Sequence, residues 1–240
     1  MPIRIGSRTF APGLLPTLAF VPLLALLLWL GHWQWTRAAE KRALFASFAA
    51  GTDATQRLPP PGAAPLERYR HVIVSGRFVA ARQFLLDNQV HAEVAGYQAL
   101  TPFLLDDGRW LLVNRGWLPV GPDRRQLPSL PVGEEHRELR GRVDAFPRAG
   151  IALTAAADSR WPRVVNYPKP AELEAALGQP LYPQQLLLDA DAPEGFVRDW
   201  QPPGLPPERH LGYAVQWWGL ALTLVVLYLG LNFRKSDAQT

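Results

Sequence analysis

The 240-residue sequence contains no cysteine and only three lysines, Lys41, Lys169 and Lys235. Without cysteine, the chain has no thiol nucleophile, no disulfide, no zinc–thiolate site and no means of passing copper between cysteine pairs. This composition is compatible with an oxidising compartment. Arginine supplies almost all of the positive charge, which we interpret as the composition of a GC-rich bacterial genome rather than as a mechanism.

Recognisable catalytic motifs are also missing. The sequence has no glycine-rich phosphate loop, no serine nucleophile elbow and no His-Glu-x-x-His pair, and no two carboxylates stand out as acid and base. Glu134, Glu135 and His136 are metal-ligating residue types, but adjacent side chains do not converge on one ion, so we expect a solvated loop there. We therefore predict that the protein is not an enzyme.

The positive charge is concentrated near the ends of the chain. Of the formal net charge of +4, a net +3 comes from Arg4 and Arg8 near the start and from Arg234, Lys235 and Asp237 near the end. A nucleic-acid-binding protein would instead concentrate its cations on the folded domain, so we exclude nucleic acid as a partner.

The first apolar run extends from Gly13 to Gly31 and contains no ionisable side chain. About 20 apolar residues match the ~30 Å core of a bilayer, which predicts a transmembrane helix over residues 13–33. A cleaved signal peptide is the alternative, but its apolar region would be shorter. Trp29, Trp33 and Trp35 follow as an interfacial aromatic belt would, which favours the transmembrane helix.

A second uncharged run, Leu211 to Leu231, predicts another transmembrane helix over residues 210–232. The alternative is a buried helix of a soluble core, which the basic pair Arg234 and Lys235 disfavours. Two spans place both ends of the chain on one side of the membrane. Because short basic tails stay in the cytoplasm, we expect residues 1–12 and 233–240 there.

The sequence between the two spans is then outside the cytoplasm, in a bacterial periplasm or a mitochondrial intermembrane space. No Arg- and Ser-rich amphipathic presequence precedes the first span, which favours the bacterial inner membrane. Residues 35–50 lack Pro and Gly and continue the first span as a membrane-proximal helical region, assigned to residues 34–57. Pro-rich linkers at 58–65 and 201–207 bracket a soluble domain, assigned to residues 58–209.

The pattern inside these brackets is mainly that of β-strands, with apolar residues alternating with polar ones. Asp106-Asp107-Gly108 predicts a hairpin turn, and Pro170 and Gly178 bound a short helix over 171–177. The fold class expected is an α+β membrane protein, in which two terminal transmembrane helices flank a mainly β domain. The strands expected are 72–78, 84–86, 97–105, 110–117, 139–146 and 184–188.

Two histidines lie at the outer ends of the spans, His32 on the first and His210 on the second. On a helix, His210, Tyr213 and Trp217 share one face, because their spacing is i, i+3 and i+7. An imidazole beside aromatic residues suits an axial haem ligand. The alternative is that histidine and aromatic residues simply favour the interface. Two arginines are near enough in sequence to pair with haem propionates, Arg37 and Arg209.

The segment Asn114 to Trp117 is the other candidate site. Gly116 predicts a bulge or a close backbone approach at the end of a strand. Arg115 is expected to pair with a carboxylate of the domain or to bind a partner protein, and Trp117 is expected in the core. A structural role is favoured over a functional one for these residues.

Several blocks of the sequence, taken together, resemble the surfeit-locus-one family of cytochrome c oxidase assembly proteins. The blocks occur in the family's order between Leu30 and Leu222, and His210 falls on the family's histidine, whereas His32 matches no family residue. The blocks are LGHWQWTRAAEK (30–41), YRHVIVSGRF (69–78), GY with TP (96–97, 101–102), LLVNRGWLP (111–119) and HLGYAVQWWGLAL (210–222).

This resemblance implies an assembly chaperone that binds haem a and assists its delivery to oxidase subunit I, with haem a synthase as the donor. It implies that His210 is the haem ligand, and His32 is a candidate second ligand at the same membrane surface. One rival hypothesis is a scaffold that holds an oxidase assembly intermediate and binds no cofactor. Another is a membrane-anchored periplasmic hydrolase, which the missing catalytic residues disfavour.

Overall fold

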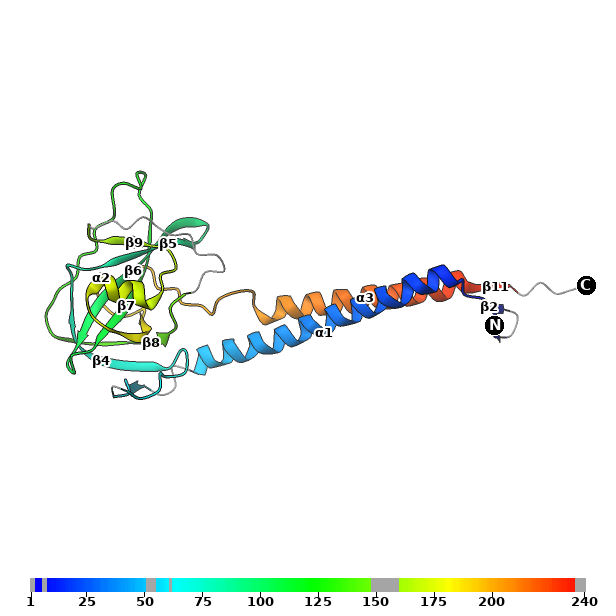
Figure 1. Ribbon diagram of the computed structural model, residues 1–240, viewed down its shortest axis with the longest axis horizontal. Helices are drawn as coiled ribbons and strands as arrows, with labels where there is room; N and C mark the ends of the chain where they lie inside the picture. The colour runs from blue at the N-terminus through cyan, green and yellow to red at the C-terminus, as the bar shows by residue number, and fades with distance from the viewer. Residues whose placement is uncertain (1–2, 6–7, 51–54, 61, 148–159, 236–240) are drawn as a thin grey trace, which may run out of the picture. The chain divides into compact units, whose positions relative to one another are not determined.

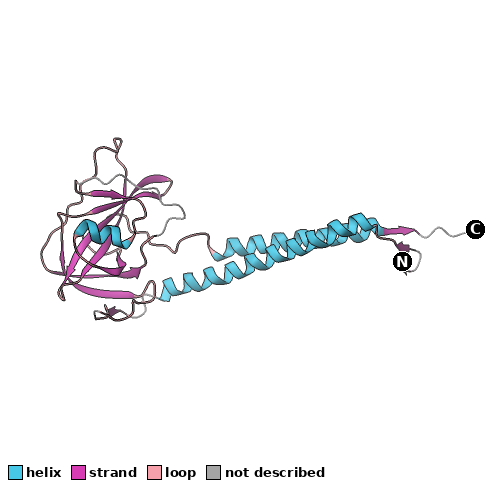
Figure 2. Ribbon diagram, in the orientation of Figure 1, coloured by secondary structure: helices cyan, strands magenta, loops and turns pink. Residues whose placement is uncertain are grey.

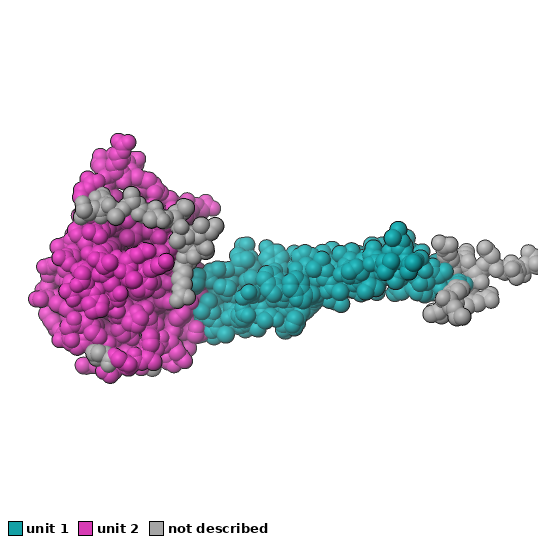
Figure 3. Space-filling view, viewed as in Figure 1, with its two compact units in different colours: residues 1–46, 203–240 teal, residues 47–202 magenta. Residues whose placement is uncertain are grey.

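The computed structural model describes residues 3–5, 8–50, 55–60, 62–147 and 160–235. The chain divides into two compact units (Figure 3), and each is described by itself. The helical unit comprises residues 1–46 and 203–240, and the β domain comprises residues 47–202.

Two long helices, α1 (Leu14–Ala50) and α3 (Pro207–Asn232), form most of the helical unit (Figure 1). Both are long and apolar enough to cross a membrane, and only 11% of the most apolar stretch of each is buried. Side chains such as Leu18, Val21 and Leu222 are more than half exposed. Because apolar surface of this extent is stable only away from water, the chain is a membrane protein.

The two helices run antiparallel and meet along a seam of small and apolar residues. The Thr17 and Tyr228 hydroxyls are 2.6 Å apart, and the Phe20 ring stacks on that of Tyr228 with centroids 3.9 Å apart. Small residues let transmembrane helices approach closely. The buried small residues of the seam are Gly31 and Ala38 on α1 and Ala214 and Ala221 on α3.

The tails form a three-stranded antiparallel sheet, in the order β1 (Ile3–Ile5), β2 (Arg8–Phe10) and β11 (Phe233–Lys235). The short tails contain no pattern long enough to predict strands. The pairing of Phe10 with Phe233 holds the beginning and the end of the chain together at one end of the helix pair, as two spans require. The sidedness of the tails stays a prediction, and residues 236–240 lie outside the described residues.

Five strands of the β domain close into a barrel in the order β4-β8-β10-β7-β6, because β4 also pairs with β6. Figure 2 shows these strands in magenta beside the short helix α2 (Pro170–Leu177). The strands β5 and β9 extend the sheet beyond β6, and β3 adds to β4. The bounds are β3 Gln56–Arg57, β4 His71–Phe78, β5 Phe84–His91, β6 Val94–Leu105, β7 Trp110–Pro119, β8 Arg137–Asp144, β9 Arg163–Val165 and β10 Leu181–Leu188.

Two apolar clusters make up most of the core of the β domain. One lies between the strands of the barrel and includes Val72, Phe103 and Leu186. In the other, Leu173 and Leu177 of α2 pack against residues of β5, β6 and β7. Burial of both clusters away from water is the main favourable term that holds the strands together.

All six predicted strands and the short helix are present, so the predicted fold class is confirmed. The hairpin turn and the helix end depend on glycine as expected, with φ of +84° at Gly108 and +69° at Gly178. The membrane-proximal helix is a single element with the first span, but its predicted end at residue 57 is wrong. Residues 56–57 form β3 instead, because they pair with Val72 and Ile73 at the edge of β4. Residues 51–54 lie outside the described residues.

Candidate functional site

His210 lies in the first turn of α3, where the Pro-rich segment gives way to helix. Pro206 is the N-cap residue and Pro207 the first helical residue, whose fixed φ and missing N–H suit that position. The Arg209 N–H donates to the Pro206 carbonyl at 3.1 Å. The backbone of His210 is therefore held by the start of the helix.

The imidazole of His210 is half-buried and contacts Gln34 of α1, 176 residues away in the sequence. Its Nδ1 lies 2.8 Å from the Gln34 amide oxygen Oε1. Because a carbonyl oxygen only accepts, Nδ1 carries the proton and donates. Nε2 then carries a lone pair, and within the described part of the chain it has no hydrogen-bond partner.

The aromatic residues predicted beside His210 lie on the same face of α3. Trp217 is half-buried on the side that faces α1, near the fully buried Ala214. Tyr213, one turn after His210, is 41% exposed at the flank of that face. The arrangement offers an imidazole lone pair beside apolar and aromatic surface, which fits the donor requirements of a haem ligand.

The other predicted haem contacts are not brought to His210. His32 is exposed, and because it precedes Gln34 by two helical positions, it points away from the side of α1 that faces α3. Arg37 forms an ion pair with Glu40 at 2.8 Å and lies over the ring of Trp33. Arg209 is exposed. Roles of His32, Arg37 and Arg209 in haem binding stay predictions.

Arg115, in the middle of β7, is 1% exposed and is the largest fully buried side chain of the described residues. Its Nε and Nη2 donate to the Glu194 carbonyl at 2.8 and 2.5 Å, and Nη2 also donates to the Pro131 carbonyl at 2.6 Å. Nη1 donates to Gln83 Oε1 at 3.2 Å and to Thr101 Oγ1 at 3.4 Å. All five N–H groups of the guanidinium are thereby used.

Arg115 was expected to pair with a carboxylate of the domain or to bind a partner protein, but its hydrogen bonds in the described residues go to neutral oxygens. The Glu194 carboxylate binds Arg137 at 2.6 Å, and Arg115 takes the backbone oxygen of Glu194 instead. Burial lowers the pKa of Arg115 to about 10, although the nearby charge of Glu194 acts in the opposite direction. A cation held by neutral oxygens inside the domain fastens two loops to β7, which is a structural role.

Gly116 and Trp117 continue this structural region. Gly116 has φ of +109°, and a Cβ there would lie 2.6 Å from the Val197 carbonyl oxygen, so the predicted close approach is confirmed, although it lies within β7 rather than at the end of the strand. The β6–β7 register also shifts at this point, as a bulge requires. Trp117 is half-buried rather than in the core, and its Nε1 donates to the Gln89 carbonyl at 3.1 Å.

Polar clusters elsewhere in the β domain are used as cross-links. His71 joins Thr55 Oγ1 (2.9 Å from Nδ1) to Asp189 Oδ2 (2.6 Å from Nε2), so both of its ring nitrogens are engaged. In the predicted solvated loop, Glu135 forms an ion pair with Arg137, and His136 lies 2.9 Å from Asp106. The described residues contain no group of three or more His, Asp or Glu side chains that could hold a metal ion.

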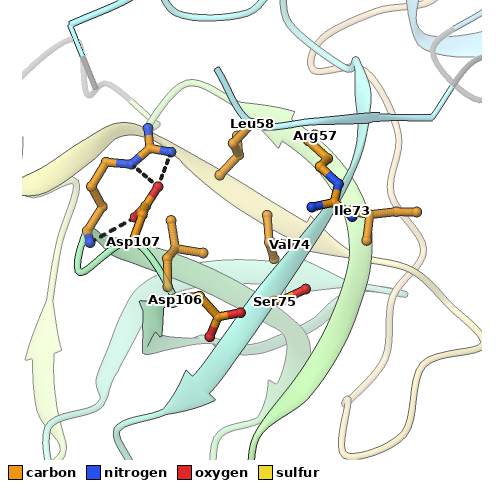
Figure 4. Close-up of a pocket in the computed structure, with 9 residues that line it drawn as sticks. Arg57, Leu58, Ile73, Val74, Ser75, Asp106 and Asp107 are labelled. Carbon is orange, nitrogen blue, oxygen red and sulfur yellow. Dashed lines mark hydrogen bonds and ion pairs between the residues drawn. The ribbon is translucent and has the colours of Figure 1, made fainter. Parts of the chain in front are cut away.

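Three clefts in the described part of the β domain are lined by residues other than histidine. One, of about 220 Å³, lies beside the β6–β7 turn, and Arg57 and Asp107 lie at opposite sides of it with Leu58 between them (Figure 4). This is below the ~300–1,000 Å³ of most small-molecule sites. The others, of about 460 and 440 Å³, border Arg115 and Trp161.

Two hydrogen bonds of the helical unit, made by Gln34 and Lys41, were not predicted from the sequence. Lys41 Nζ donates to the Pro203 carbonyl at 2.7 Å, which ties α1 to the segment before α3. Both residues lie within the LGHWQWTRAAEK block, but a hydrogen bond to a residue more than 160 positions away leaves no local pattern in the sequence.

Comparison with known proteins gives a consistent family assignment. The SURF1 family model matches residues 21–222. A SURF1-like protein of Rickettsia conorii is 25% identical over 217 residues, which cover 85% of this chain and 85% of that protein. The cytochrome oxidase assembly protein SHY1 of Saccharomyces cerevisiae is 31% identical over 140 residues, which cover 54% of this chain and 35% of the yeast protein. The chain thus matches about a third of the yeast protein's length.

Proposed function

Because the chain belongs to the SURF1 family, we propose that it is a cytochrome c oxidase assembly factor that binds haem a through His210 and assists its delivery to oxidase subunit I. The observation that carries the haem assignment is the state of the His210 imidazole. Nδ1 is engaged by Gln34, and Nε2 is left with a lone pair beside an exposed aromatic flank. Neutral imidazole is the usual protein ligand of haem iron.

One strong ligand suits a protein that must release its cargo. Two tightly held axial ligands would oppose transfer, whereas a single imidazole with apolar contacts allows the haem to leave for a better site. His32 points away from the α3-facing side of α1, which is consistent with one strong ligand. Haem a synthase as donor and subunit I as acceptor are the partners that the family resemblance implies.

The proposed location is the bacterial inner membrane, with the β domain in the periplasm. This proposal is supported by the basic residues beside both spans, which are Arg4 and Arg8 before α1 and Arg234 and Lys235 after α3. Short segments rich in Lys and Arg remain on the cytoplasmic side of a membrane. His210, at the start of α3, would then lie at the periplasmic surface.

A scaffold without a cofactor is the second candidate. It is favoured by the β domain, in which Arg115 and His71 hold loops in place and the three clefts of the described residues named above contain no histidine. On that account, His210 and Gln34 merely fasten the helices together. Neither account requires a covalent step, which agrees with the proposal that the protein is not an enzyme.

The experiment that separates the two candidates is purification of the full chain in detergent from cells that make haem a. We expect the wild-type protein to carry haem absorbance and His210→Ala to lose it while remaining folded and membrane-inserted. Gln216→Ala is the matched control, because Gln216 is exposed on the same helix. A colourless wild-type protein, or full haem content in His210→Ala, would contradict haem binding at this residue and favour the scaffold.

A further inference from the structure

Gln34 is a polar residue in the seam between α1 and α3, and the seam residues on either side of it in α1 are small. On α1 the buried residues before and after it are Gly31 and Ala38. The adjacent Trp33 and Trp35 are 42% and 50% exposed, whereas Gln34 is half-buried and directed at α3. An amide at such a position is unfavourable unless it is hydrogen-bonded, and its partner is His210.

We propose that Gln34 is a positioning residue for His210. By accepting the Nδ1–H, the amide oxygen selects the tautomer in which Nε2 carries the lone pair, and it restricts rotation of the ring. Metal-binding histidines commonly donate their other ring N–H in this way to a carbonyl or carboxylate, which fixes the ring and increases its basicity. This inference rests on the proposed function.

The contacts on both sides of the pair hold it in register. Toward one end, Lys41 Nζ donates to the Pro203 carbonyl at 2.7 Å, and Pro203 lies three residues before Pro206, the N-cap of α3. Toward the other, Gly31 leaves room for the Trp218 indole, with which any side chain at position 31 would overlap. These flanking contacts hold α1 and α3 together, so the Gln34–His210 hydrogen bond is not the only interaction that keeps the two residues close.

The choice of a neutral acceptor has a chemical consequence. A carboxylate at position 34 would draw the Nδ1 proton more strongly and make Nε2 a stronger donor to iron. The amide would increase the basicity of the imidazole less than a carboxylate, and a bond from Nε2 to haem iron would then be weaker. A weaker bond suits a haem that has to leave, and the proposal predicts opposite effects for removal and strengthening of the acceptor.

The first test needs no haem. Imidazole ¹⁵N spectra of the full-length protein, assigned by comparison with His210→Ala, report which ring nitrogen of His210 carries the proton. We expect the Nδ1–H form in the wild type and a mixture of tautomers in Gln34→Leu, with Gln216→Leu unchanged. An unaltered Nδ1–H signal in Gln34→Leu would overturn the positioning role, whether or not the protein binds haem.

The second test uses protein loaded with haem a and follows haem loss to an excess of apomyoglobin. We expect Gln34→Leu to release haem about 10–100-fold faster than the wild type, in the range found for loss of such supporting residues. Gln34→Glu should retain the haem, release it more slowly and lower its reduction potential. Wild-type release and potential in both variants would contradict the proposal. Failure of His210→Ala to lose haem would instead contradict the proposed function.

Discussion

Arg115 and His71 of the β domain differ from His210 of the helical unit in how fully their polar atoms are engaged. In the β domain, Arg115 spends all five N–H groups on protein oxygens, and His71 engages both ring nitrogens. In the helical unit, His210 engages one ring nitrogen and leaves the other without a partner among the described residues. For these three residues, full engagement goes with a structural role, whereas the second ring nitrogen of His210 is available to a ligand. An unpartnered atom is not by itself a site, because buried atoms such as Tyr69 Oη and Gln184 Oε1 of the β domain also have no partner within the described ranges.

Replacement of Arg115 should produce the largest effect, and it should appear in stability. Arg115→Met leaves the buried Pro131 and Glu194 carbonyls without the guanidinium that donates to them, so we expect a loss of about 3–5 kcal/mol in the free energy of unfolding. Arg115→Lys should recover little, because an ammonium cannot reproduce the planar fork.

Urea unfolding of the full chain in detergent, followed by tryptophan fluorescence, measures this loss. Arg124→Met is the matched control, because the Arg124 side chain is 55% exposed and its ion pair with Asp87 should contribute little. Equal stabilities of the Arg115 and Arg124 variants would show that the buried guanidinium is not a structural clamp. Arg115 could then no longer serve as the structural residue with which His210 is compared.

A substitution at Gly31 should disturb the helical unit and spare the β domain. Gly31→Leu places a side chain where the Trp218 indole lies, at a cost of about 1–3 kcal/mol typical of overpacking. Because the chain has no native cysteine, a cysteine pair at positions 17 and 228 can report helix contact by reaction with a short bifunctional thiol cross-linker, whose length replaces the tyrosine ring that spans the gap. We expect less cross-linking in Gly31→Leu than in Gly219→Leu, where no atom lies within 4 Å of the added Cβ. Equal cross-linking would mean that the seam does not depend on Gly31.

The smallest predicted effect is the alkaline pH dependence of the β domain. Burial raises the pKa of Tyr69, Tyr97 and Tyr182 above the ordinary value of 10.0. The unfolded chain then ionises first as the pH rises, so these tyrosines contribute stability that is present below about pH 10 and lost above it. The lowered pKa of Arg115 acts in the opposite sense, because the unfolded state holds that proton to higher pH.

Phenolate absorbance and urea midpoints, measured on either side of about pH 10, test this dependence. We expect Tyr69, Tyr97 and Tyr182 to ionise only above about pH 10 or when the domain unfolds. The urea midpoint should fall over the same range of pH. Tyr97→Phe should make the fall shallower and leave the helical unit unaffected. Ionisation of all tyrosines near pH 10 with no change in midpoint would contradict the burial assigned to these rings.

Much of the β domain was predictable because its strands are apolar segments bounded by turn residues. The strand β4 follows from its alternating polarity, and β6 and β7 follow from the Asp106-Asp107-Gly108 turn between them. The strands β3 and β9 were missed because they contain two and three residues and exist only through their pairing with β4 and β5. Such short segments carry too little periodicity to be recognised before the tertiary structure is known.

The candidate site was predictable in part. The position of His210 relative to Tyr213 and Trp217 follows from helical spacing, because all three lie within eight residues. The contact with Gln34 and the outward direction of His32 depend on how α1 is rotated against α3, which spacing within one helix does not determine. The partners of Arg115 were unpredictable for another reason: two of them are backbone carbonyls, which every residue carries.

The most direct test of haem handling is the haem a content of oxidase subunit I in membranes of cells that lack this gene. Complementation with the wild-type chain should restore haem a in subunit I, whereas His210→Ala, present at the same level in the membrane, should leave it depleted without abolishing haem a synthesis. Full restoration of haem a in subunit I by His210→Ala would contradict the account and identify the protein as a scaffold that handles no haem.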